Sequence, residues 1–304
     1  MPTTHTLLEQ FRSFYYQNNP ETIELGLELF AIFGGTSWTI ETSRPILELI
    51  ESKILKNYPY IHSDITQMTH SNKLSHALLS AIALGDRRIF STFKRIRISR
   101  EEGEHALGTL YRSGLLETEY SLERPLREED DNSDKLNFIQ PFMRFWFSCV
   151  SPFYKSIKEG KYEEFHERLG QREQDFAAFI FEKLSYEVLK NNLQEDKIAE
   201  IGAYWDKNVS IDLLAKTRSG KLIAGTCKYS NAKVKKTELT KLKEACVLAG
   251  LEPDMYVIFS KNGFSNELKT LKGDTLKLFN VKSFKTLVED LSEKDFIPCS
   301  GKKY

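Results

Sequence analysis

The chain has little cysteine, no long apolar run and no net charge. Its four cysteines are widely spaced and form no Cys-x-x-Cys pair, so a disulfide framework or a structural zinc site is not expected. A membrane span needs a run of about 18 or more apolar residues, and none occurs. The 43 Lys and Arg balance the 43 Asp and Glu, which excludes a uniformly basic nucleic-acid binder.

Several catalytic signatures are also missing. No Gly-x-x-x-x-Gly-Lys-Ser/Thr loop occurs, and the six histidines show no His-x-His or His-Glu-x-x-His spacing, which argues against a zinc enzyme. The first apolar pair is followed at once by Glu9, Gln10 and Arg12, so the start does not resemble a secretory signal. We therefore expect a cytoplasmic protein with no membrane partner, and 304 residues suffice for two domains.

The first part of the chain, residues 1–68, is predicted to be a helical region. Apolar residues recur at helical spacing between Ile23 and Ile32, and again between Ile46 and Leu55 after Pro45. The pair Gly34–Gly35 should end the first of these stretches.

Residues 69–140 have the pattern of a winged helix-turn-helix. Helices are predicted over 74–84 and 89–96, and a third follows the capping box formed by Ser99 and Glu102 and ends at Gly114. An extended segment, the expected wing, follows.

The charges of this unit are mixed. Residues 86–100 carry six basic residues and one acidic residue, but the helix in the recognition position begins with Glu101, Glu102 and Glu104. The expected wing is strongly acidic, which disfavours contact with a DNA backbone. We therefore favour a protein-contact or scaffold role for this unit over DNA binding. The acidic residues of the wing are Glu117, Glu119, Glu123, Glu128, Glu129, Asp130, Asp131 and Asp134, against Arg124 and Arg127.

Residues 141–168 form an aromatic linker. Large side chains of this kind usually fill cores and interfaces, so we expect them to pack between two domains. The alternative is a platform on which nucleic-acid bases stack. The rings are Phe142, Phe145, Trp146, Phe147 and Phe153.

The last part, residues 169–304, is predicted to be a small α/β domain. Its elements follow the order αβββαβ with additions, and Arg218-Ser219-Gly220 suits a tight hairpin turn between the second and third strands. The whole chain is therefore predicted to combine a helical N-terminal region with an α+β or α/β C-terminal domain. The predicted helices span 174–191, 237–249, 267–272 and 284–291, and the predicted strands span 197–205, 209–217, 221–229, 254–260 and 275–281.

One carboxylate in this domain stands out. Asp212 lies among apolar strand residues, where burial is costly unless the group is paired or binds a cation. On the partner strand, Thr226 and Lys228 share one face and Cys227 points to the opposite face, because side chains alternate with a period of two. Lys228 can therefore face Asp212. A plain Asp212–Lys228 pair at the sheet end and a functional site both remain open.

At these residues the chain resembles the PD-(D/E)xK nuclease superfamily, whose restriction-endonuclease-like core has the order αβββαβ. The segments IGAYWDK (201–207), IDL (211–213), GTCKY (225–229) and QPFMRFWF (140–147) further resemble the C-terminal part of a family of bacterial and archaeal ATPases of unassigned function. In that family an ATPase domain precedes a winged helix, the aromatic segment and a nuclease-like domain. The resemblance covers about residues 70–290, and the ATPase domain is absent from this chain.

The resemblance implies a metal-dependent phosphodiesterase site. Asp212, a second acid at position 226 and Glu182 on the preceding helix would hold Mg²⁺ or Mn²⁺, and Lys228 would orient the attacking water. The chain departs from the pattern because Thr226 stands in the place of the second acid. Some restriction enzymes that resemble this fold bring a glutamate from the following helix, for which Glu238 and Glu244 are the candidates here.

A lysine-rich stretch surrounds the same residues. From position 216 to 243, nine basic residues face one acidic residue, a charge of +8 that favours a polyanionic partner. The alternative is a soluble lysine-rich face. The basic residues are Lys216, Arg218, Lys221, Lys228, Lys233, Lys235, Lys236, Lys241 and Lys243.

Three functions compete on these grounds. The first is a nucleic-acid-binding protein, with DNA as the expected ligand, whose nuclease-like domain has lost its metal site. The second is a Mg²⁺- or Mn²⁺-dependent nuclease that uses Asp212, Lys228, Glu182 and Glu238. The third is an interaction partner of a separate ATPase or another protein.

Overall fold

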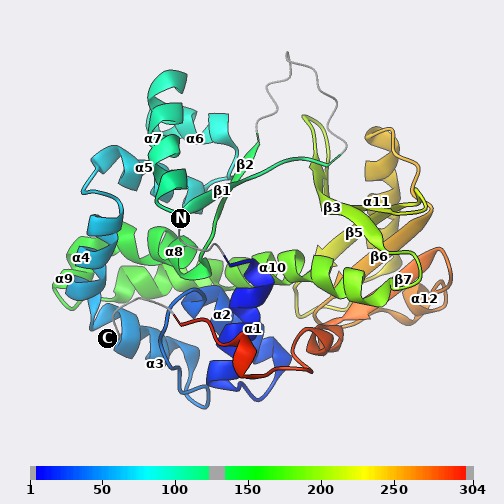
Figure 1. Cartoon of the computed structure of the whole chain (residues 1–304), viewed down its shortest axis with the longest axis horizontal. Helices are drawn as coiled ribbons and strands as arrows, with labels where there is room; N and C mark the ends of the chain where they lie inside the picture. The colour runs from blue at the N-terminus through cyan, green and yellow to red at the C-terminus, as the bar shows by residue number, and fades with distance from the viewer. Residues whose placement is uncertain (1–4, 123–133, 299–304) are drawn as a thin grey trace.

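A computed structural model describes residues 5–122 and 134–298 of the chain. Helices fill the N-terminal region, and a five-stranded mixed sheet with flanking helices forms the C-terminal part (Figure 1). The predicted mixed α and β fold is confirmed. No helix in the described ranges is long and apolar enough to cross a membrane.

The two helical stretches predicted in the N-terminal region occur close to their expected positions, and two further helices lie on either side of them. A capping box between Thr6 and Glu9 starts the first helix, and the segment after Pro45 continues from an α-helix into one π-helical turn. Their apolar faces pack inward, with Phe11, Leu27 and Phe30 fully buried. The elements are α1 (Leu7–Asn18), α2 (Ile23–Phe33), α3 (Ile46–Ile50), η1 (Glu51–Leu55) and α4 (Tyr58–Met68).

Three helices and a two-stranded hairpin follow, and we call them the hairpin unit. The predicted capping box of Ser99 and Glu102 starts the third helix. The two strands pair antiparallel, with Leu116 opposite Phe138. Five acids of the predicted wing, between Glu123 and Asp131, lie outside the described residues. The unit comprises α5 (Lys73–Leu84), α6 (Ile89–Ile96), α7 (Arg100–Arg112), β1 (Leu116–Glu119) and β2 (Lys135–Phe138).

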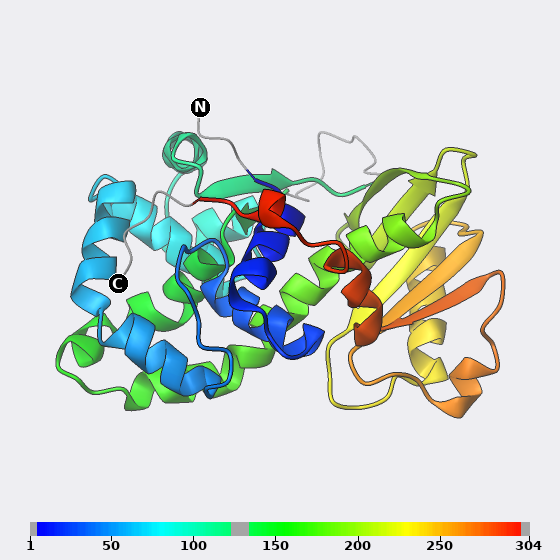
Figure 2. The same cartoon turned by 60° about the horizontal axis from the view of Figure 1, so that its bottom comes forward.

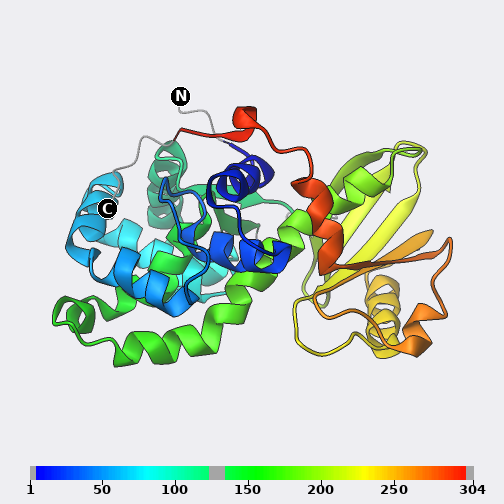
Figure 3. The ribbon, with the colours of Figure 1, turned by 90° about the horizontal axis from the view of Figure 1, so that it is seen from below.

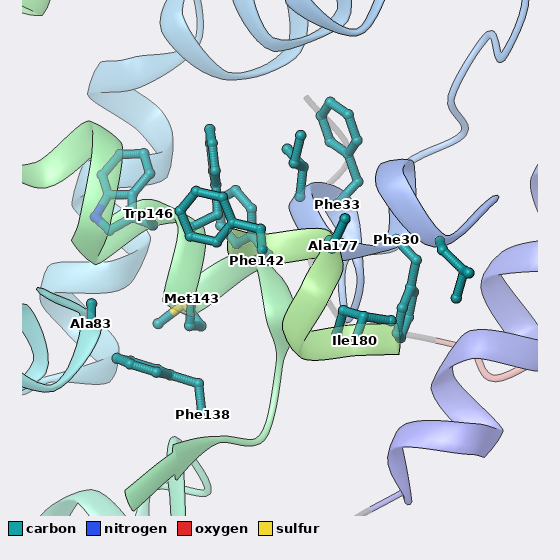
Figure 4. Close-up of a cluster of buried hydrophobic side chains, with 14 of the residues drawn as sticks. Phe30, Phe33, Ala83, Phe138, Phe142, Met143, Trp146, Ala177 and Ile180 are labelled. Carbon is teal, nitrogen blue, oxygen red and sulfur yellow. The ribbon is translucent and has the colours of Figure 1, made fainter. Parts of the chain in front are cut away.

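The aromatic segment after the hairpin unit lies in the protein core. Phe145, Trp146 and Phe147 are at most 1% exposed, and Trp146 stacks on the ring of Tyr58 with a centroid separation of 5.5 Å. Figure 4 shows Trp146, Phe142 and Met143 of this segment in one cluster with side chains from α2, from β2 and from the helix that follows the segment. Phe142, Phe145, Trp146 and Phe147 are therefore closed to nucleic-acid bases, whereas Phe153 is half-buried. The segment comprises α8 (Pro141–Phe145), η2 (Trp146–Val150), η3 (Ser151–Phe153) and α9 (Tyr154–Lys158).

One long helix, α10 (Glu163–Asn192), connects the two parts of the molecule (Figures 1 and 2). Its first half packs in the N-terminal core and its last turns lie against the sheet, so one continuous apolar cluster runs from Phe30 to Phe259. The helix starts eleven residues before the predicted position, Gln174. The first part of the helix is rich in polar residues such as Glu163, Glu164 and Glu167, so apolar periodicity did not predict it.

The sheet has the order β3-β4-β5-β6-β7. The first three strands pair antiparallel, and β5, β6 and β7 pair parallel, with α10 against one face and α11 against the other (Figure 2). The expected order αβββαβ is therefore present. The elements are β3 (Ile198–Trp205), β4 (Ser210–Thr217), β5 (Leu222–Lys228), α11 (Lys236–Leu248), β6 (Met255–Ser260), α12 (Asn266–Lys269) and β7 (Leu276–Asn280).

The end of the chain differs from the expectation of an α-helix over 284–291. A 3₁₀-helix, η4 (Val281–Leu287), and a second short one, η5 (Glu293–Asp295), follow β7 instead. The chain then returns along α1 (Figure 3). Arg12 holds it there through ion pairs with Asp290 (2.8 Å) and Asp295 (2.6 Å).

A second set of contacts joins α2 to the carboxyl ends of β5 and β6. Tyr229 donates a hydrogen bond to the Glu28 carboxylate (2.9 Å), and Lys261 pairs with Glu24 (2.9 Å) and Glu28 (3.2 Å). Burial, and then the charge of Glu28, raises the pKa of Tyr229 far above its usual value. The tyrosine therefore stays protonated and remains a donor.

Candidate functional site

A small pocket lies between β4, β5 and α11, near the carboxyl end of β5. It measures about 130 Å³. Its wall includes Asp212 and Lys228, the residues expected to act in catalysis, and Thr226, which stands in the place of the second acid. Glu238, the candidate substitute for that acid, and Lys241 also line it. In sheets of this kind ligands bind outside the carboxyl ends of parallel strands, which makes this pocket the candidate site.

Asp212 reaches the pocket from an irregular position in β4. Between the pairs Gly202–Leu214 and Tyr204–Ile211 the register with β3 shifts, so β4 carries one extra residue there. Such a bulge turns side chains away from strict alternation and is common beside functional sites. Leu213 and Leu214 pack into the apolar clusters on opposite faces of the sheet, so these adjacent apolar residues reflect a strand covered on both sides and did not signal the bulge.

Asp212 is held by its neighbours on β5 rather than by Lys228. One carboxylate oxygen accepts hydrogen bonds from the Thr226 hydroxyl (2.8 Å) and from the Cys227 backbone N–H (2.9 Å). On the other side of the sheet, the Tyr186 hydroxyl donates to the Asp212 backbone carbonyl (2.8 Å). Next to them, Gly225 allows β5 to pack closely on β6, because an added Cβ would lie 2.5 Å from a Val257 methyl group.

Lys228 pairs with Glu238 instead. Its ammonium group lies 3.2 Å from one Glu238 oxygen, and Lys241 donates to the other oxygen at 2.7 Å. The hydrogen bond from Lys241, supported by that from Lys228, holds the pKa of Glu238 below its usual range against the effect of burial. The expected alternative of an Asp212–Lys228 pair is therefore wrong, because the helix that follows β5 supplies a nearer carboxylate.

The side chains of this pocket do not fit a Mg²⁺ or Mn²⁺ centre as they stand. Such ions need several oxygen ligands, and carboxylates that are free to bind. Asp212 shares one oxygen with two donors, and both oxygens of Glu238 are occupied by lysines. Among the described residues, no group of three or more His, Cys, Asp or Glu is arranged to hold a metal ion.

Glu182, the third expected acid, is on α10 and does not line the pocket. Its carboxylate lies 3.2 Å from the ammonium group of Lys183. Cys227 points to the same side of the sheet, as expected from alternation, and its sulfur lies 3.2 Å from the Ser185 hydroxyl of α10. Burial, followed by the charges of Asp212 and Glu182, raises the pKa of this thiol well above its usual value, so it is not a nucleophile at neutral pH.

The lysine-rich stretch is divided between the two ends of the sheet. Arg218 and Lys221 flank the β4–β5 turn, where Gly220 has a positive φ of 90°. Lys228 lies at the far end of β5, and six residues of strand at about 3.3 Å each separate the two ends by about 20 Å. Lys216 pairs in register with Leu222 at the turn end. The pocket end holds Lys228, Lys233, Lys235, Lys236 and Lys241.

Two of the pocket-end lysines are exposed and have no partner among the described residues, namely Lys233 and Lys235. They belong to the loop from β5 to α11, which is held in place by backbone bonds between Val234 and both Gly263 and Ser265. Lys236, at the start of α11, pairs with Glu267 (3.2 Å). A firmly positioned loop therefore presents positive charge beside the pocket.

The hairpin unit is attached to α10 by buried charges that the sequence did not indicate. Glu119, one of the acidic residues of the expected wing, is bonded to Lys183 of α10 and lies 3.2 Å from Arg87. Burial would raise the pKa of Glu119, but the charges of Lys183 and Arg87 lower it to about 2. The described part of the wing is thus anchored to α10 through Glu119, while Tyr120 beside it stays exposed.

Backbone contacts extend this attachment along the edge strand β3. The Ser121 hydroxyl accepts a hydrogen bond from the Trp205 N–H (2.8 Å) and donates to its carbonyl (3.0 Å), and Leu122 N–H donates to the Ala203 carbonyl (2.9 Å). The ammonium group of Lys135 lies 4.0 Å from the centre of the Trp205 ring. The edge of the sheet is therefore covered by the chain that leaves β1.

Comparisons with known proteins give a partial match. A family described as "Archaea bacterial proteins of unknown function" matches residues 146–241, which include Asp212, Lys228 and Glu238. The uncharacterized protein MJECL04 of Methanocaldococcus jannaschii is 28% identical over 145 aligned positions, covering 41% of this chain and 32% of that protein. The chain thus spans about a third of the length of this relative. No solved structure matches the chain.

Proposed function

We propose that this protein binds nucleic acid through the pocket end of its sheet, and that its nuclease-like domain does not cleave the bound strand. The observation that carries the proposal is that Lys228 and Lys241 line the pocket, while Lys233, Lys235 and Lys236 follow in the loop and first turn of α11 that succeed β5. Asp212 and Glu238 share the pocket wall, and Glu267 pairs with Lys236. Lysines neutralise backbone phosphates, and the released counterions supply affinity that does not depend on sequence.

The nuclease-like part of the proposal is supported by the arrangement of the domain. The order αβββαβ, with Asp212 on the second strand and Lys228 at the end of the third, is that of the PD-(D/E)xK core. The three helices and hairpin before it have the order of a winged helix. Because this hairpin is packed against α10 and β3, we assign the unit a scaffold role and not a role in reading DNA.

The absence of cleavage follows from the donors at the pocket. The Thr226 hydroxyl donates to Asp212 where the nuclease pattern has a second acid, and a hydroxyl carries no charge to attract a divalent ion. Glu238 reaches the pocket, but its carboxylate is neutralised by two lysines. We therefore expect no hydrolysis of plasmid, single-stranded DNA or RNA with Mg²⁺ or Mn²⁺. Cleavage that disappears in Asp212→Ala would establish the nuclease alternative.

Binding is tested with two triple variants that remove equal charge from opposite ends of the sheet. The first changes Lys233, Lys235 and Lys236 to Ala, and the second changes Arg218, Lys221 and Lys277 to Ala. Fluorescence anisotropy with a labelled DNA duplex measures the affinity at several salt concentrations. We expect the first variant to bind more weakly and to lose about 0.9 in the slope of log Kd against log[salt] for each phosphate contact removed.

The second variant separates local contacts from overall charge. It has the same net charge as the first, but its substitutions lie about 20 Å from the pocket, as judged by the length of β5. Its affinity should remain close to that of the wild type. Equal losses in the two variants would mean that binding follows net charge alone, and unchanged affinity in the first would rule out the proposed surface.

A further inference from the structure

Glu238 lies between Lys228 and Lys241 in the wall of the pocket. One carboxylate oxygen accepts a hydrogen bond from Lys241 (2.7 Å), and the other forms an ion pair with Lys228 at 3.2 Å. A phosphate group also offers paired oxygens with negative charge. We propose that Glu238 is an internal phosphate mimic, which keeps these two lysines occupied until nucleic acid displaces it. This inference rests on the proposed function and concerns the regulation of the same site.

The position of the glutamate makes displacement feasible. Glu238 is in the first turn of α11, and its backbone N–H bonds to the Lys235 carbonyl, so the main chain there is fixed while the side chain rotates. The Glu238 side chain is 21% exposed, whereas those of Lys228 and Lys241 are 39% and 69% exposed. A ligand in solvent can therefore reach both ammonium groups without disturbing the core.

The energetics also favour exchange. Ion pairs with such exposure contribute little to stability, because water screens them and long side chains lose freedom when they pair. A polyanion brings several phosphates to the neighbouring lysines and releases several counterions. It therefore gains more binding free energy than a single carboxylate can supply. The contact thus lowers affinity for isolated anions while it permits binding of a strand.

The first test is the isosteric variant Glu238→Gln, with Glu244→Gln as its matched control. Both remove one negative charge from α11, but among the described residues Glu244 is outside ion-pair distance of any lysine and acts on Lys241 only through the weaker effect of a more distant charge. We expect Glu238→Gln to bind a labelled DNA duplex about fivefold more tightly than the wild type at moderate salt, and Glu244→Gln to gain clearly less. The salt slope should steepen by up to about 1.8, because two lysines each add one phosphate contact.

A second variant keeps the negative charge at position 238 and shortens only the side chain that carries it. Glu238→Asp is shorter by one methylene group, so its carboxylate cannot contact both lysines while the net charge of the protein stays the same. Its affinity should also rise above that of the wild type. In the Glu238→Gln protein, Lys228→Gln and Lys241→Gln should each remove part of the gain. Thermal melting verifies that all variants are folded.

The outcomes separate this inference from the proposed function. If the wild type binds DNA and Glu238→Gln binds no better than Glu244→Gln, the internal mimic is wrong while nucleic-acid binding stands. If the wild type does not bind but Glu238→Gln does, the mimic is supported in a stronger form. If neither binds, both proposals are overturned.

Discussion

The buried ammonium group of Lys183 is predicted to stabilise the attachment of the hairpin unit to α10. It is bonded to Glu119, lies 3.2 Å from Glu182 and 3.4 Å from the Tyr186 hydroxyl, and its side chain is 12% exposed. Replacing it in Lys183→Met leaves the Glu119 carboxylate buried with one cation fewer. Breaking a buried pair in this way typically costs about 3–5 kcal/mol.

The pKa of Glu119 gives a second measure of the same interaction. Burial acts to raise it, and the charges of Lys183 and Arg87 bring it down from 4.5 to about 2. Because each pKa unit corresponds to 1.36 kcal/mol, the ionised state of Glu119 contributes about 3 kcal/mol to the free energy of unfolding. Because the pKa is lowered on folding, this contribution is fully present above about pH 4.5 and is lost as the pH falls toward about 2.

The free energy of unfolding is measured by urea titration, followed by tryptophan fluorescence. We expect Lys183→Met to lose about 3 kcal/mol at neutral pH and less in acid, where the wild type has also lost the interaction. The matched control is Lys190→Met on the same helix, whose ammonium group is 42% exposed and should matter by at most about 0.5 kcal/mol.

A double variant isolates the pair. Lys183→Met with Glu119→Gln removes both charges. The stability lost in this double variant should be smaller than the sum of the losses in the two single variants, by at least about 1 kcal/mol. The reasoning is refuted if Lys183→Met is no less stable than Lys190→Met, or if the two single losses simply add.

Three further predictions follow from other contacts. Thr226→Glu places a second carboxylate beside Asp212, so Mn²⁺ should raise the Tm of this variant and leave that of the wild type unchanged; an equal shift in both would contradict the account of the pocket. Arg12→Ala should lose about 2 kcal/mol and expose the last described residues to faster hydrogen exchange, with a smaller loss in acid, because the Arg12 hydrogen bond lowers the pKa of Asp295. Tyr229→Phe should cost about 1 kcal/mol in urea titration, and no change would mean that its bond to α2 is dispensable.

Local features of the fold were predictable because neighbours along the chain decide them. The capping box of Ser99 and Glu102 and the hairpin turn at Gly220 occur as expected. The strands of the C-terminal domain lie within a residue or so of their predicted bounds. The lack of an acid at Thr226 is also a property of the sequence itself, and it is the reason for expecting no cleavage. Alternation along β5 placed Lys228 and Cys227 on opposite faces correctly.

The partners of charged side chains were decided only by tertiary structure. Lys228 pairs with Glu238 and not with Asp212, because a bulge in β4 turns Asp212 toward Thr226 and the packing of α11 brings its first turn over the strand end. The folding of β4 on β5 divides a lysine-rich stretch that is continuous in the sequence. Glu119 became a buried ion because the hairpin unit docks on α10. Electrostatic partners depend on distances between residues far apart in the chain, and composition and periodicity carry no such distances.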